Sequence, residues 1–134
     1  MKFKLKKIGV ALAGSTLVMT MAFNAVSAGT FRVTSVPYAS ATRVNKTKTT
    51  DTKKIGCTAK LNNGNPRTVY VYAYDSNSKL LAPTVKAKED AGTKTENYYS
   101  GKSGNKGKKI IVSYRDSTGT GFGSFNTDTT INYY

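Results

Sequence analysis

One seven-residue stretch, Thr68 to Tyr74, most constrains what this chain can fold into. It reads T-V-Y-V-Y-A-Y, so small apolar residues alternate with tyrosines. Side chains of an extended strand point alternately to its two faces, whereas a helix would scatter these residues around its axis. β-Branched and aromatic side chains also suit the pleated surface of a sheet. We therefore predict a central β-strand with one apolar face and one tyrosine face.

Shorter runs of the same kind recur along the chain, at roughly 8–12-residue spacing between turn signals. The strongest such signal is Asn62-Asn63-Gly64-Asn65-Pro66, and no stretch after residue 28 has a helical period. The predicted strands cover residues 29–36, 41–50, 53–61, 68–74, 79–87, 95–100, 109–115 and 129–134. The 41–50 run is polar on both sides, which is typical of an edge strand. The pattern predicts an all-β, two-sheet antiparallel sandwich of immunoglobulin-like size, with a small closed barrel as the alternative.

The first 28 residues have the pattern of a secretory signal peptide rather than of a folded element. Lys2, Lys4, Lys6 and Lys7 precede an apolar run, and Val26-Ser27-Ala28 supplies small residues at a cleavage site. The apolar run is shorter than the roughly 20 residues that a membrane span needs, which argues against an anchor. We expect cleavage between Ala28 and Gly29 and a mature single all-β domain, residues 29–134. The lysine-rich leader is typical of Gram-positive exported proteins.

The chain is strongly basic, with a formal net charge of +14 and no histidine. Loss of the four leader lysines lowers the charge to +10, which is large for 106 residues and attracts anions over a wide pH range. Eight lysines are candidate polyanion ligands and form two clusters: Lys46, Lys48, Lys53 and Lys54, then Lys102, Lys106, Lys108 and Lys109. Outside a Gram-positive cell the polyanions are wall phosphate polymers, anionic lipids and released nucleic acid. The alternative is that the charge serves solubility alone.

Five tyrosines are candidate surface aromatics: Tyr70, Tyr72, Tyr74, Tyr98 and Tyr99. Exposed rings could stack on sugars or bases. The alternative for the three tyrosines of the 68–74 strand is that they pack against the second sheet of the sandwich.

No catalytic or metal-binding motif stands out. Cys57 lacks a histidine base and falls between Ile55 and Ala59, so we expect it in the core. The seven carboxylates lie mostly in predicted turns, and no calcium loop or zinc motif is present. The run Gly119 to Gly123 lacks the Lys-Ser/Thr of a phosphate loop. We expect no enzymatic activity, no metal and no cofactor.

These features predict a secreted, extracellular or cell-wall-associated protein that binds anionic polymers of the cell envelope, or has a structural role there. The alternative is a cationic bacteriocin or toxin that acts on the membranes of other cells. Leader and charge fit both, but the mature chain has no amphipathic helix or long apolar segment. We expect no specific nucleic-acid partner and no transmembrane anchor after cleavage.

Overall fold

The computed structural model describes residues 29–134, so the expected leader lies outside the described residues. Within this range the chain forms eight strands and no helix. The strands are β2 (Thr30–Pro37), β3 (Thr42–Thr47), β4 (Lys54–Leu61), β5 (Thr68–Asp75), β6 (Val85–Lys88), β7 (Thr93–Asn97), β8 (Lys109–Asp116) and β9 (Ser124–Asn132). A search of residues 29–134 for a helix long and apolar enough to cross a membrane finds none.

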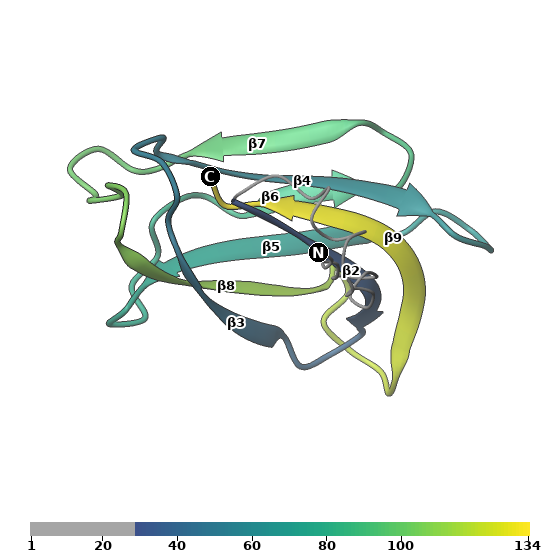
Figure 1. Cartoon of the computed structure of the whole chain (residues 1–134). Helices are drawn as coiled ribbons and strands as arrows, with labels where there is room; N and C mark the ends of the chain where they lie inside the picture. Colours follow the sequence, from purple (N-terminus) through teal and green to yellow (C-terminus); the bar gives the residue numbers. More distant parts are fainter. Residues whose placement is uncertain (1–28) are drawn as a thin grey trace, which may run out of the picture.

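The strands form two four-stranded antiparallel sheets that lie as two layers (Figure 1). The first sheet has the order β2-β9-β4-β7, and the second has the order β3-β8-β5-β6. The prediction of an all-β fold with two antiparallel sheets is therefore confirmed. The barrel alternative is wrong, because the strands pair within two separate sheets and not around one closed sheet.

The order of the strands follows a simple rule. The first four strands pair with the last four in reverse, as β2–β9, β3–β8, β4–β7 and β5–β6, like the two arms of one long hairpin. Two further pairs, β4–β9 and β5–β8, join the arms of this hairpin where it wraps around itself. Eight strands arranged in this way form a jelly roll.

The core lies between the two sheets and is built from alternate residues of each strand. Val69, Val71 and Ala73 of β5 are fully buried, and β5 lies between β8 and β6, as expected for a central strand. Ile55 and Cys57 of β4 meet them from the first sheet and are also fully buried. The apolar face of the Thr68–Tyr74 stretch therefore points inward, and its tyrosine face points out.

The last strand is longer than the sequence indicated, because part of its buried face is polar. It begins at Ser124, whereas the apolar pattern alone predicted a start at residue 129. Thr127 and Thr129 take inward positions between Phe125 and Ile131 and are buried. Their hydroxyls lie 2.7 Å apart and hydrogen-bond to each other, which satisfies them without water.

Candidate polyanion-binding surface

The fold brings part of the first lysine cluster, Lys53 and Lys54, beside the second cluster at one end of the sandwich. The backbone N–H of Lys48 donates to the carbonyl of Lys108, and the N–H of Gly107 donates back to the carbonyl of Lys48, both at 2.9 Å. The N–H of Lys106 donates to Oδ1 of Asp51 at 2.8 Å. The segment before β4 therefore lies along the glycine-rich loop before β8. We call the resulting surface the basic end; its residues are Lys53, Lys54, Lys102, Lys106, Lys108 and Lys109.

A buried tyrosine holds the glycine-rich loop in place. The N–H of Tyr98 donates to the carbonyl of Lys53 at 2.9 Å, and the Tyr98 ring packs on Gly104, where an added Cβ would lie only 2.6 Å from the ring. Tyr98 is 8% exposed, and burial raises the pKa of its hydroxyl to about 12. The expectation that Tyr98 is a surface aromatic is therefore wrong.

Lys48 is the one lysine of the two clusters that the structure removes from the surface. Its side chain is buried, and Nζ donates to the carbonyls of Thr52 at 2.5 Å, Tyr134 at 3.0 Å and Tyr133 at 3.2 Å. Burial lowers the pKa of Lys48, and the attraction of Asp51 opposes that shift. The prediction that Lys48 contacts a polyanion is wrong, because the C-terminal segment crosses over it and uses its donors.

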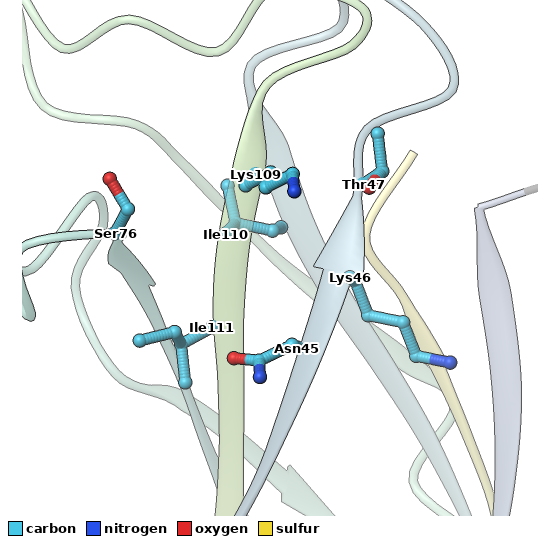
Figure 2. Close-up of a pocket in the computed structure, with 7 residues that line it drawn as sticks. All are labelled: Asn45, Lys46, Thr47, Ser76, Lys109, Ile110 and Ile111. Atoms are coloured by element: carbon cyan, nitrogen blue, oxygen red, sulfur yellow. The ribbon is translucent and has the colours of Figure 1, made fainter.

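Lys46 is half-buried and reaches away from the other lysines. Its Nζ lies 4.5 Å from the centroid of the Phe31 ring and 5.6 Å from that of Tyr133. Figure 2 shows its side chain directed away from Asn45 and Ile111. Lys46 therefore covers aromatic side chains at the sandwich edge and is not part of the basic end.

Two open pockets flank Ser76 at the basic end. One, of about 450 Å³, contains Asn45, Thr47, Lys109 and Ile111 in its lining (Figure 2). The other, of about 250 Å³, is lined in part by Asn77, Lys102, Ser103 and Lys108, and it also contains the carboxylate of Asp75. Their ammonium, hydroxyl and amide groups can donate hydrogen bonds to oxyanions.

The tyrosine face of β5 forms the outer surface of the second sheet. Tyr70, Tyr72 and Tyr74 are half-buried and lie on the side opposite to Val69 and Val71. The alternative that these tyrosines pack against the other sheet is therefore wrong. Tyr99, the remaining candidate, is 45% exposed and lies apart from them, in a pocket with Pro83, Lys86 and Glu96 among its lining residues.

Three cations accompany these tyrosines and were missed by the sequence analysis. Arg115 of β8 and Lys86 of β6 are the cross-strand neighbours of Tyr70, and Arg43 of β3 reaches the Tyr74 ring. β6 follows β5 directly in the chain, but β3 and β8 are far from β5 in sequence, so only the fold brings Arg43 and Arg115 to the tyrosines. We call these six residues (Tyr70, Tyr72, Tyr74, Arg43, Lys86 and Arg115) the tyrosine–cation stack.

The groups considered for catalysis have structural partners. Cys57 is fully buried, as expected for a core residue, and burial raises the pKa of its thiol to about 12. Asp75 accepts the N–H groups of Asn77 and Lys79 in a turn, and Asp90 accepts that of Leu61. Asp116 accepts two hydrogen bonds from Arg67. Among residues 29–134 no three His, Cys, Asp or Glu side chains gather in a group that could hold a metal ion.

Comparisons with protein-family models, with curated proteins and with solved structures found no match to this chain.

Proposed function

We propose that this protein is secreted and binds anionic polymers of the cell envelope through its basic end, without catalysing a reaction. The observation that carries the proposal is that Lys53 and Lys54 meet the second lysine cluster, which lies about fifty residues further along the sequence. Backbone hydrogen bonds between Lys48, Gly107 and Lys108 hold the two segments together.

The electrostatics of the basic end support this role. Five of its lysines are exposed and the sixth, Lys102, is half-buried. Asp51 is the carboxylate within this surface that accepts a hydrogen bond from the lysine loop, and its Oδ1 is engaged by the N–H of Lys106. Clustered ammonium groups raise the local concentration of a polyanion, and binding releases its counterions.

A membrane-active toxin is the alternative, and the exposed apolar residues bear on it. Phe122 is fully exposed in the loop that follows β8, whereas Leu80, just after the Ser76 turn, is only 39% exposed. The basic end lies at the start of β8, so an eight-residue strand, about 23 Å long, separates the two. Apolar insertion and cationic attraction therefore act at opposite ends, which favours polymer binding over docking on a flat membrane. Dye leakage from anionic vesicles at micromolar protein would contradict the proposal.

The test is sedimentation of the secreted protein with isolated Gram-positive cell walls, before and after chemical removal of their anionic polymers. We expect co-sedimentation that needs the polymers and fades with salt. The variant Lys106→Gln/Lys108→Gln should bind about fivefold more weakly. The matched control is Lys60→Gln/Lys94→Gln, which removes two exposed lysines from the first sheet. Equal loss in both variants would mean that net charge, and not the basic end, determines retention.

A further inference from the structure

We propose that the outer face of the second sheet is a separate binding site, centred on the tyrosine–cation stack, for a hydroxyl-rich polymer that carries oxyanions. Such a ligand is an anionic glycan or a polyol phosphate. This site lies on a sheet face and the basic end lies at the strand ends, so each can be tested without the other.

The stack is a continuous row of rings and cations, in the order Lys86, Tyr70, Arg115, Tyr72, Tyr74 and Arg43. The rings of Tyr72 and Tyr74 are stacked, with centroids 6.2 Å apart and planes at 23°. The Arg115 guanidinium carbon lies 5.5 Å from the Tyr70 centroid and 5.7 Å from that of Tyr72. The Arg43 guanidinium lies 5.0 Å from the Tyr74 centroid. Each arginine is therefore held against at least one ring, which reduces the entropy lost on binding.

The two arginines have donors to spare. Arg115 uses Nη1 to donate to the carbonyl of Asp116 at 2.7 Å, and Gly119 packs closely against the same guanidinium. Arg43 donates to Oγ of Ser78 at 3.1 Å. The ion pairs in the described part of the chain involve Arg32 and Arg67 and leave these two arginines without a carboxylate. A guanidinium has five N–H donors in a planar fork that matches phosphate and carboxylate oxygens.

The outer faces of the two sheets differ in a way that solubility does not explain. The outward positions of the second sheet carry five cations and no carboxylate; the cations are Arg43, Lys86, Lys88, Lys109 and Arg115. Outward positions of the first sheet are mostly Thr, Asn and Ser and include no aromatic residue. The outward cations of the first sheet are Arg32, Lys54 and Lys60, and Arg32 is neutralised by Asp128 at 2.7 Å. The second sheet therefore has the larger excess of outward cations, and it alone carries outward tyrosines.

The geometry favours a hydroxyl-rich ligand over single-stranded nucleic acid. Bases bind such surfaces by stacking on free ring faces. Here Tyr72 faces Tyr74 on one side and contacts Arg115, while Tyr74 contacts Arg43. The groups that remain for a ligand are the unused guanidinium donors and the tyrosine hydroxyls. The three hydroxyls have no protein partner among residues 29–134. These groups hydrogen-bond to oxyanions and hydroxyls.

The experiment measures the affinity of the secreted protein for four soluble polymers by isothermal titration. Lipoteichoic acid supplies phosphate with a polyol, alginate supplies carboxylate with sugar hydroxyls, polyphosphate supplies charge alone, and oligo-dT supplies phosphate with bases. The variant Tyr70→Phe/Tyr72→Phe/Tyr74→Phe removes three hydroxyls and keeps the rings. Tyr38→Phe removes the hydroxyl of a half-buried tyrosine that contacts Phe125 and Arg67, away from the stack, and is its control. Arg115→Lys keeps the positive charge and removes the planar fork of guanidinium N–H donors.

We expect the triple variant to bind lipoteichoic acid, alginate or both about tenfold more weakly, and Arg115→Lys about fivefold more weakly, with the affinity of Tyr38→Phe unchanged. If the triple variant loses affinity for lipoteichoic acid alone, the ligand carries phosphate. If it loses affinity for alginate alone, the ligand carries carboxylate. The triple variant should bind polyphosphate with the same affinity as the wild-type protein. Unchanged affinity of a correctly folded triple variant for both hydroxyl-bearing polymers would overturn the proposal. So would oligo-dT as the tightest ligand. Lys106→Gln/Lys108→Gln in the same titrations reports separately on the basic end.

Discussion

The ammonium group of Lys48 donates to three backbone carbonyls and so ties the β3–β4 connection to the C-terminal residues. Replacement by Met would leave these acceptors without a partner in a site too buried for water to replace the lysine freely. We expect Lys48→Met to lower the free energy of unfolding by about 2–3 kcal/mol, measured by urea unfolding at pH 7. Lys46→Met, two residues away, should cost about 0.5–1 kcal/mol, because it loses only cation–π contacts.

The difference in unfolding free energy between the wild-type protein and Lys48→Met should also depend on pH, which gives a second measurement. Burial lowers the pKa of Lys48 from its ordinary 10.5, so the unfolded chain holds the proton more tightly than the folded protein does. The stability of the wild-type protein relative to Lys48→Met should therefore rise as the pH rises toward 10.5. A difference that falls over this range would contradict the placement of Lys48 in the interior.

The burial of some residues could be predicted from the local sequence pattern, whereas the burial of others depends on contacts that the local pattern does not show. The burial of Cys57 could be predicted, because Ile55 and Ala59 share its face of the strand. The burial of Lys48 and Tyr98 could not. Each lies beside residues of the same type. The C-terminal residues cover Lys48, and Tyr98 is covered by its own following loop at Gly104 and by Lys48, whose Nζ lies 5.4 Å from the ring centroid.

The loop between Tyr98 and Lys109 holds its lysines in place through one close contact. An added Cβ on Gly104 would meet the buried Tyr98 ring at 2.6 Å, so the ring or the loop would have to shift. We expect Gly104→Ala to cost about 1–3 kcal/mol in unfolding free energy and to weaken wall binding, because it displaces Lys106 and Lys108.

Gly107→Ala is the matched comparison in the same loop. Its Cβ would enter open space, but its φ of 85° strains any residue except glycine. We expect a cost of about 1 kcal/mol. If Gly104→Ala bound cell walls as tightly as the wild-type protein, the loop position would not matter for binding.

At the level of elements, local alternation predicted most strands but not their order. The strand around Thr68–Tyr74 was predicted almost to its limits, and it runs from Thr68 to Asp75. β9 was predicted too short, because its inward Thr127 and Thr129 look like surface residues. Strand order depends on pairs such as β2 with β9, which join the two ends of the described chain. One sequence contains no local signal for such pairs.

The whole molecule presents two cationic surfaces, and the binding that we propose for each depends on different physics. The basic end carries mostly exposed ammonium groups, which would attract a polyanion through charge and counterion release. The tyrosine–cation stack offers fixed guanidinium forks and hydroxyls, whose attraction depends on hydrogen-bond geometry. Composition could predict that the protein is cationic, but only the fold could divide the cations between these surfaces.

This difference predicts how salt should affect binding. Counterion release makes the logarithm of the association constant fall linearly with the logarithm of salt concentration, with a slope that grows with the number of phosphates neutralised. Neutralising Lys106 and Lys108 should reduce the steepness of that slope by about 1.5, because each contact contributes about 0.7–0.9. The triple Tyr→Phe variant should bind more weakly at every salt concentration with the slope unchanged, because it removes no charge.

The measurement is a titration of the secreted protein with lipoteichoic acid between about 50 and 300 mM salt, a range over which such slopes are resolved. Lys60→Gln/Lys94→Gln serves as the control and should keep the wild-type slope, because neither lysine belongs to the two surfaces. If the slope of the control fell as much as that of Lys106→Gln/Lys108→Gln, binding of the polymer would depend only on the total charge of the protein. A reduced slope in the Tyr→Phe variant would show that its hydroxyls position charged groups, so that the two surfaces act as one.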